Sequence, residues 1–405
     1  MRRTATTPGS AALESALVER LTSPVDVGSR AGASVALDVG GGEGWTFHVD
    51  RGELMLAYGL DEAADSRIQT DAGTMVAILR DERAGIEAFI AGDLRVRGDL
   101  ALTLRLSGSL PDSSAPARFP RGREGVSGGG TFYLEAGSGA PVLLLHGLGA
   151  TNASMLTTLW DLAADHHVIA PDLPGFGDSA KPVRSYDAAF YGRWVVALLD
   201  ELGIDKAHIV GNSLGGRVAI EAALQAPERV DRLALLTPSP AFIKRRELVR
   251  VVRLLRPEMG LVPLPMSHRR VVQSIKALFS RPHRLPDPWY DAAADEFLRV
   301  FRSPRGRVAF FSAARQIYLE EPYGEAGFWD RIRDLSRPAL FVWGDRDRLV
   351  PAAFARHVER AVPDAQSILL QDCGHVPQFE HPERTHAAIR EFLAAGGLGR
   401  RPARA

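Results

Sequence analysis

The stretch that decides the fold is AHIVGNSLGG, residues 207–216. Its first four residues form an apolar run that predicts a strand, and an amphipathic segment, 215–226, predicts a helix after it. Ser213 has a glycine two positions before it and another two positions after it, which is typical of a nucleophile elbow. In such a tight turn the serine backbone is strained, and a side chain at Gly211 or Gly215 would collide with a neighbouring strand or helix. Ser213 would lie at a helix N-terminus, where the macrodipole favours a developing negative charge, and is the candidate nucleophile.

Strand-like and helix-like segments alternate on both sides of this stretch. The expected strands are 141–145, 167–170, 207–210, 232–236, 339–343 and 367–370, and the expected helices are 188–202, 215–226, 352–362 and 383–394. Continuous apolar runs are typical of strands that are buried on both faces. The alternation therefore predicts an α/β fold with a mainly parallel sheet between two layers of helices, and sites in such sheets form at the carboxyl ends of the strands.

Two further groups of polar residues follow expected strands. Gly344-Asp345-Arg346-Asp347 comes after one strand, and Cys373-Gly374-His375 comes after the last. A histidine can act as base for the serine and then as acid for the leaving group, while a carboxylate fixes its tautomer. We therefore expect Ser213, His375 and one of the two aspartates to meet.

Residues 130 to 396 resemble the α/β hydrolases of the esterase, lipase and carbon–carbon hydrolase group. The resemblance is carried by five motifs in order: His146-Gly147-Leu148-Gly149, Asp172-Leu173-Pro174-Gly175-Phe176-Gly177-Asp178-Ser179, the elbow, the Gly344-x-x-Asp347 loop and Gly374-His375. It implies that Asp347, rather than Asp345, is the acid, because of its spacing from Gly344. It also implies that backbone N–H groups of Leu148 and Leu214 form the oxyanion hole, with no metal or organic cofactor.

The elbow, extended to Gly216, also resembles that of the meta-cleavage (carbon–carbon bond) hydrolases. Those enzymes usually carry a tryptophan directly after the catalytic histidine, where this chain has Val376. We therefore expect cleavage of a carboxylic ester of a lipophilic substrate. Carbon–carbon cleavage of a ring-cleavage product is the first alternative, and lipid binding or transfer with a vestigial hydrolase is the second.

The segment 239–335 interrupts the alternation and is expected to be a helical cap. Its first part, 239–286, has eleven Lys or Arg and only two acids, Glu247 and Glu258. The spacing of Leu248, Val251, Val252 and Leu255 against Arg246, Arg250 and Arg253 predicts a helix with a basic face. That face is either simply solvated or attracts an anionic substrate, an acidic partner domain or, by peripheral contact, a membrane surface. The apolar cap residues are candidates for an acyl pocket or for plain core: Phe242, Leu261, Leu264, Met266, Phe279 and Trp289.

Residues 1–112 form a different block, and residues 113–129, rich in Ser, Pro and Gly, are the expected linker. The block is predicted to contain helices at 11–21 and 74–90 and strands at 34–39, 45–49, 53–58, 66–70 and 94–97. It resembles the sterol-carrier-protein type of lipid-binding domain through residues 45–50, 64–68 and 88–99. The resemblance implies a small α+β domain that binds a fatty acyl chain or a sterol. Because the block up to Leu110 has sixteen acids against eleven arginines, we expect it to dock on the basic cap.

Composition limits the remaining possibilities. A formal net charge of zero gives no global field for nucleic acid, so no nucleic-acid partner is expected. The single cysteine, Cys373, excludes an internal disulfide and fits a reducing compartment. No apolar run approaches the ~18 residues of a membrane span, and Arg2 and Arg3 precede no signal-like apolar segment. These features predict a cytoplasmic protein.

Overall fold

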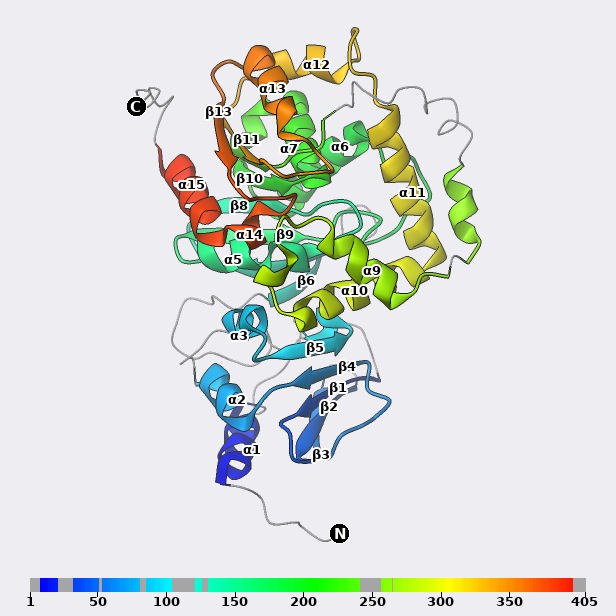
Figure 1. The fold of residues 1–405 in the computed structure, drawn as a ribbon, viewed down its shortest axis with the longest axis vertical. Helices are drawn as coiled ribbons and strands as arrows, with labels where there is room; N and C mark the ends of the chain where they lie inside the picture. The colour runs from blue at the N-terminus through cyan, green and yellow to red at the C-terminus, as the bar shows by residue number, and fades with distance from the viewer. Residues whose placement is uncertain are drawn as a thin grey trace.

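The computed structural model describes residues 8–20, 32–50, 53–80, 85–103, 121–125, 130–240, 256–263 and 265–395. It has two domains that lie one above the other, with the N-terminal domain at the bottom of Figure 1. Both expected fold classes are observed, a small α+β domain followed by an α/β domain. Within the described ranges, no helix has the length and apolar character needed to cross a membrane.

The described part of the N-terminal domain contains a five-stranded sheet, the helices α1, α2 and α3, and further helical residues at 100–103. Its elements are α1 (Pro8–Arg20), β1 (Ala33–Asp38), β2 (Gly44–Asp50), β3 (Glu53–Tyr58), β4 (Ser66–Gln69), α2 (Ala72–Leu79), α3 (Gly85–Ala91) and β5 (Arg95–Gly98). The strand order is β3-β2-β1-β4-β5, and β1 and β4 are parallel. The domain core contains Leu13, Leu17, Trp45 and Phe47, all fully buried. One helix was expected over 74–90, and the structure has α2 and α3 there.

The second domain contains an eight-stranded sheet. Its strands are β6 (Arg121–Gly125), β7 (Thr131–Ala136), β8 (Ala140–Leu145), β9 (His166–Pro171), β10 (Ala207–Asn212), β11 (Val230–Leu236), β12 (Ala339–Gly344) and β13 (Gln366–Leu370). Their order is β13-β12-β11-β10-β8-β9-β7-β6, with β6 and β7 antiparallel at one edge and the rest parallel. The expectation of a linker over 113–129 is wrong where β6 lies. The sequence of β6 is Arg-Gly-Arg-Glu-Gly, and an edge strand of this kind has no apolar run from which it could be predicted.

Successive residues of the central strands point to opposite faces of this sheet. Leu143 and Leu145 of β8 pack with α6 (Ala188–Glu201) and α7 (Leu214–Gln225). Val142 and Leu144 pack on the other face with α5 (Leu156–Leu162) and α15 (Pro382–Ala394). Both faces of the central strands are therefore covered, which explains why the strands read as continuous apolar runs. The short helices around them are η2 (Asn152–Met155), η3 (Pro227–Arg229), η8 (Ala352–Phe354), α13 (Ala355–Ala361) and α14 (Pro377–Glu380).

The helical cap lies between β11 and β12, where it was expected. Its described elements are η5 (Pro257–Leu261), α9 (His268–Lys276), η6 (Pro282–Arg284), α10 (Asp287–Arg302), α11 (Pro304–Leu319), α12 (Phe328–Arg331) and η7 (Ile332–Asp334). The basic helix expected over 246–255 lies outside the described residues. Figure 1 places α10 directly above β5, between the two domains.

The N-terminal domain packs against the cap and one face of the large sheet. Ile86, Val96 and Leu100 join the core formed by α5 and α15. Phe89 and Ile90 of α3 pack on an aromatic cluster of the cap and its surroundings that includes Phe279, Leu285, Trp289, Tyr290 and Phe379. The two domains therefore share apolar core.

The described polar contacts between the domains include ion pairs of both signs. Arg97 of the N-terminal domain donates from Nε to Asp295 Oδ2 of α10 at 2.7 Å, and the Gly98 N–H donates to the same oxygen at 3.1 Å. A second ion pair joins Asp99 to Arg299 of α10 at 3.5 Å. A block's net charge does not tell which of its charges lie at an interface. The Asp99–Arg299 pair has the sign expected for an acidic block on a basic cap and the Arg97–Asp295 pair has the opposite sign, so docking through the basic residues of 239–286 stays a prediction.

Candidate active site

Ser213 lies in the turn between β10 and α7, as the sequence predicts. Its backbone has φ 54° and ψ −113°, in the region that side-chain-bearing residues rarely adopt. A Cβ on Gly211 would lie 2.4 Å from Gly215 O, and one on Gly215 would lie 2.1 Å from Leu145 O. Both glycines are therefore required by close backbone contacts, with the helix start in one case and with β8 in the other. This arrangement is the strained turn predicted from the motif.

His375 and Asp347 meet in a buried pair beyond the ends of β12 and β13. The distance from His375 Nδ1 to Asp347 Oδ2 is 2.7 Å. Asp347 Oδ1 accepts N–H bonds from Leu349 and Val350, so the carboxylate is held by its own loop. Because the carboxylate can only accept, Nδ1 carries the proton and Nε2 is left with its lone pair. His375 Nε2 is buried and forms no hydrogen bond within the described part of the chain, so it is free to accept a proton.

The competing aspartate, Asp345, has another role. It is exposed, and its Oδ1 accepts the N–H of Cys373 at 3.1 Å. It therefore helps to hold the loop that carries His375, while Asp347 contacts the imidazole itself. Burial raises the pKa of the Cys373 thiol, which leaves it in the unreactive protonated form.

Further contacts fix the His375 backbone beside Ser213. The amide of Asn212, the residue before the nucleophile, donates to His375 O at 3.2 Å, and Thr237 Oγ1 donates to the same oxygen at 2.8 Å. The His375 N–H donates to Leu278 O of the cap at 2.8 Å. The nucleophile turn and the histidine loop are thus tied together. In the described structure the serine and histidine side chains form no hydrogen bond with each other, a contact that often tightens only with substrate.

Glu380 joins the histidine loop to the cap, and sequence reasoning missed it. Its Oε1 accepts the Gly374 N–H at 2.6 Å, and its Oε2 accepts both the N–H and the Oγ–H of Ser280 at 2.7 Å. The only signal in the sequence was an acid five residues after His375, which is not specific.

The loop expected to form the oxyanion hole lies beside the nucleophile. A Cβ on Gly147 would be 3.4 Å from Ser213 Cβ, so the segment from Gly147 to Gly149 borders the serine. Leu148 is half-buried in this loop, and Leu214 is the first residue of α7. Their backbone N–H groups remain the predicted oxyanion donors.

His146 holds this loop rather than taking part in chemistry, as expected. Its Nε2 accepts the Leu173 N–H at 2.9 Å, so its protonated Nδ1 donates to Gly147 O at 2.8 Å. Complete burial lowers its pKa to about 4, which keeps the ring neutral. Nearby, burial and the Asp178 carboxylate raise the pKa of Asp172 to about 7, and Asp172 accepts N–H bonds from Asn152 and Asp178. These residues shape the turn beside the site.

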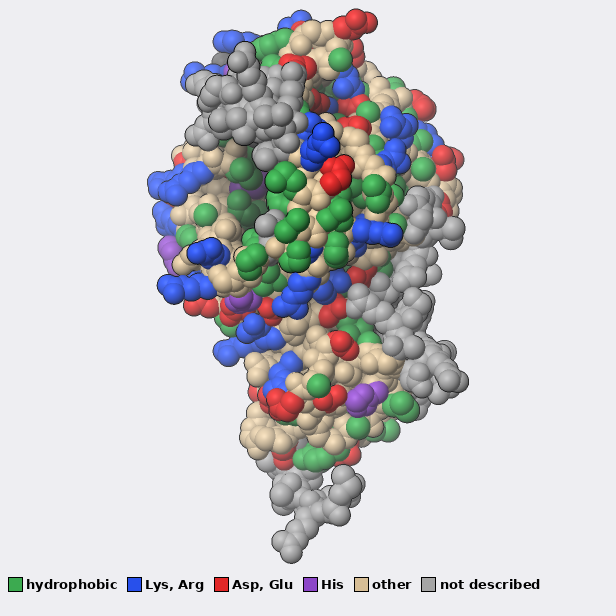
Figure 2. Space-filling model, turned by 90° about the vertical axis from the view of Figure 1, so that its right-hand side faces the viewer, with side chains coloured by type: hydrophobic (Ala, Val, Ile, Leu, Met, Phe, Trp, Pro, Cys, Tyr) green, Lys and Arg blue, Asp and Glu red, His purple; other side chains and the backbone are tan. Residues whose placement is uncertain are grey.

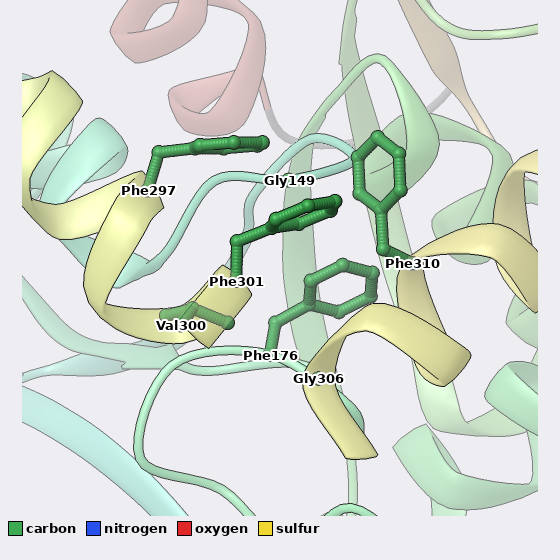
Figure 3. Close-up of a pocket in the computed structure, with 7 residues that line it drawn as sticks. All are labelled: Gly149, Phe176, Phe297, Val300, Phe301, Gly306 and Phe310. Carbon is green, nitrogen blue, oxygen red and sulfur yellow. The ribbon is translucent and has the colours of Figure 1, made fainter. Parts of the chain in front are cut away.

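A small apolar pocket lies next to the oxyanion loop. Figure 3 shows its aromatic side chains gathered around Gly149, and the lining residues are Gly149, Phe176, Phe297, Val300, Phe301, Gly306 and Phe310. A Cβ on Gly149 would lie 2.9 Å from the Phe310 ring, which places the pocket directly against the loop. The pocket is therefore built by α10, α11 and two core loops, and it carries no charged side chain.

These residues are not the ones expected for an acyl pocket. Leu261 and Met266 are exposed at the surface of the cap. Phe279 and Trp289 belong to the aromatic cluster that packs against α3 of the N-terminal domain. Phe242 and Leu264 lie outside the described residues. The phenylalanines of α10 and α11 were missed because their spacing looks like that of ordinary helix core.

Comparison with known proteins agrees with this geometry. The model of the alpha/beta hydrolase fold family matches residues 140–382, more than half of the chain. The chain belongs to this family. Residues 23–111 match the SCP-2 sterol transfer family, in agreement with the resemblance of the N-terminal domain.

Three similar proteins illustrate the range of this family. The 2-hydroxymuconate semialdehyde hydrolase of Pseudomonas putida is 30% identical over 69% of this chain and 97% of its own length. The dihydrolipoyllysine-residue acetyltransferase component of the acetoin cleaving system of Cupriavidus necator is 31% identical over 64% of this chain. This chain spans only 66% of that protein's length. Among solved structures, a membrane phospholipase A described as a bacterial virulence factor has a TM-score of 0.57 and 27% identity, covering 68% of this chain and 86% of its own.

Proposed function

We propose that this protein is a serine hydrolase that cleaves a carboxylic ester of a lipophilic substrate through an acyl-enzyme. The observation that carries the proposal is the buried His375–Asp347 pair, with Nε2 unpartnered, tied by Asn212 to the turn that holds Ser213. The apolar pocket beside the oxyanion loop supports an acyl or other hydrocarbon group as its ligand. The SCP-2 domain supports a lipophilic substrate as well.

The geometry supports the following reaction. Ser213 Oγ attacks the ester carbonyl carbon while its proton passes to His375 Nε2, and Asp347 stabilises the imidazolium through Nδ1–H. The N–H groups of Leu148 and Leu214 donate to the oxyanion. Collapse of the tetrahedral intermediate breaks the C–O bond, and the leaving alcohol takes the proton from His375. Water then attacks the acyl-enzyme by the same route and releases the carboxylic acid with free Ser213.

Carbon–carbon hydrolysis is the second candidate. It is favoured by the similarity to 2-hydroxymuconate semialdehyde hydrolase, which extends over nearly all of that enzyme. Against it, the chain has Val376 at the position where the meta-cleavage enzymes usually have a tryptophan. Val376 packs with the aromatic cluster that contacts α3. Because Val376 replaces that tryptophan, and because Ser213, His375, Asp347 and the two backbone N–H groups suffice for ester hydrolysis, we favour the ester.

Hydrolysis assays with full-length protein test both candidates. A series of p-nitrophenyl esters of increasing acyl length should be cleaved, with a preference for chains that fill the pocket, and Ser213→Ala should abolish turnover. A fluorophosphonate probe should label wild-type protein at Ser213. Cleavage of a ring-cleavage dienoate, followed by its ultraviolet absorbance, with no cleavage of any ester would favour the second candidate. Failure of the probe to label Ser213 would contradict both.

A further inference from the structure

The cap exposes an apolar segment that its own core does not use. In the segment 256–270, Met259, Leu261 and Val262 are 59%, 56% and 61% exposed. Pro263, Pro265 and Met266 are exposed as well. Single exposed apolar residues are ordinary, but six within eight positions of the chain make this segment a candidate interaction surface. Figure 2 faces this side of the cap and shows hydrophobic side chains gathered together, with Lys and Arg around them.

The apolar segment is held in a fixed position by Arg307 of α11. This side chain is buried, and its guanidinium donates to Gly260 O at 2.6 Å and to Leu261 O at 3.3 Å. It also donates to Phe301 O and Arg302 O at the end of α10. Gly260 allows η5 to lie this close, because a Cβ there would be 2.9 Å from the Arg307 backbone. The exposed side chains are therefore presented by a built structure.

The charge of the segment is positive at its rim. Arg256, Arg269 and Arg270 are exposed, and Glu258 is the only acid between residues 256 and 270. Apolar side chains with arginines around them match the two layers of an anionic bilayer, the acyl region and the phosphate headgroups.

The segment lies on the outer side of the helices that form the apolar pocket. Arg307, which holds it, is one residue after Gly306 and three before Phe310, both of which line the pocket. The carbonyl groups it binds on α10 belong to Phe301, a third lining residue, and its neighbour. A surface in contact with lipid would thus be attached to the wall of the pocket.

We propose that residues 256–263 and 265–270 form a docking surface for anionic lipid bilayers. Leu261, Val262 and Met259 enter the acyl region, and Arg256, Arg269 and Arg270 contact the lipid phosphates. This binding does not depend on the chemistry at Ser213, so it can be measured apart from the proposed hydrolysis.

Vesicle sedimentation of the full chain tests the proposal. Wild-type protein should bind phosphatidylcholine vesicles that contain phosphatidylglycerol and bind pure phosphatidylcholine vesicles much more weakly. The double variant Leu261→Ser/Val262→Ser should weaken partitioning roughly tenfold or more, because two apolar side chains no longer enter the bilayer. Arg269→Glu/Arg270→Glu should weaken it by roughly fivefold for each arginine removed, and the effect should shrink at high salt.

Matched controls use exposed residues elsewhere. Met55→Ser/Tyr58→Ser removes comparably exposed apolar side chains from the N-terminal domain, and Arg360→Glu/Arg384→Glu reverses two exposed charges on α13 and α15. Both controls should bind like wild type, and all variants should keep the wild-type melting temperature. Absence of binding to anionic vesicles, equal binding by the Leu261/Val262 variant, or loss of binding in a control would overturn the proposal. A concentration-dependent dimer abolished by Leu261→Ser/Val262→Ser, without vesicle binding, would instead assign the surface to a second copy of the chain.

Discussion

Arg97 and Asp295, 198 residues apart in the chain, join the N-terminal domain to the cap through a 2.7 Å hydrogen bond from Arg97 Nε to Asp295 Oδ2. Asp295 belongs to α10, and the same helix carries Phe297, Val300 and Phe301 of the apolar pocket. Helix α10 is therefore shared between the interface of the two domains and the wall of the candidate site. Docking of the N-terminal domain and the shape of the pocket cannot be independent.

The first prediction concerns this interface. Asp295→Ala should lower the free energy of unfolding by about 1–3 kcal/mol, because Arg97 and the Gly98 N–H lose a mostly buried acceptor. Urea denaturation measures the change. The matched control is Asp287→Ala on the same helix, where the carboxylate is 82% exposed and pairs with Lys276. That variant should stay within about 0.5 kcal/mol of wild type, and equal losses in the two variants would contradict the interface.

A second prediction separates the two aspartates after β12. Asp347→Asn should lower kcat by on the order of 10³–10⁴, because an amide would donate to His375 Nδ1 and impose the wrong tautomer. Asp345→Asn should keep activity close to wild type, since its amide oxygen can still accept the Cys373 N–H. Steady-state kinetics on a p-nitrophenyl ester provide the comparison. The reverse order of effects would assign the acid to Asp345.

The third prediction concerns acyl-chain preference. Phe297 stacks on Phe301 with ring centroids 5.2 Å apart and lines the pocket. Phe297→Ala should enlarge the pocket and raise kcat/KM for long acyl chains relative to short ones. Phe311→Ala is the matched control, because Phe311 contacts Phe301 and Phe310 but does not line the pocket. An unchanged ratio in the Phe297 variant would show that the acyl group binds elsewhere.

The fourth prediction is a pH dependence of stability. Burial lowers the pKa of His146 from its ordinary value of 6.5 to about 4, so between these values the unfolded chain binds more protons than the folded one. The contribution of His146 to the unfolding free energy should therefore be greatest above pH 6.5 and fall by up to about 3 kcal/mol as the pH drops toward 4. Asp172, whose pKa is raised to about 7, contributes in the opposite direction over the same range.

The variant His146→Gln isolates that contribution. Its amide oxygen can accept the Leu173 N–H and its NH2 can donate to Gly147 O, but it does not titrate. Denaturation at several pH values should show the difference in unfolding free energy between the two proteins shifting in favour of the variant as the pH falls from 6.5 toward 4. Parallel curves for the two proteins would mean that His146 does not cause the loss.

Much of the fold was predictable because it rests on local patterns. Buried parallel strands such as Leu143–Leu145 must be apolar on both faces, and the elbow must carry glycines at 211 and 215, so each leaves a mark in the sequence. The pairing of Asp347 with His375 could be predicted because both follow strands whose carboxyl ends share one edge of the sheet.

The features that escaped prediction depend on tertiary contacts. Strand β6 gains its partners from β7 and has no pattern of its own. The pocket combines Phe297 and Phe310 from two cap helices with Phe176 from a core loop, and no local spacing connects them. The interface between the domains depends on which individual side chains face each other, such as Arg97 and Asp295. The net charge of each domain does not contain that information.

The left-handed backbone of Ser213 has a consequence for the history of the chain. Glycine adopts such a conformation without the steric cost that a side chain meets, so Ser213→Gly should fold to a product more stable than the active enzyme, by about 1 kcal/mol. Mutation and selection for stability alone would therefore discard the nucleophile. The strained turn thus lowers stability in exchange for an accessible hydroxyl at the start of α7.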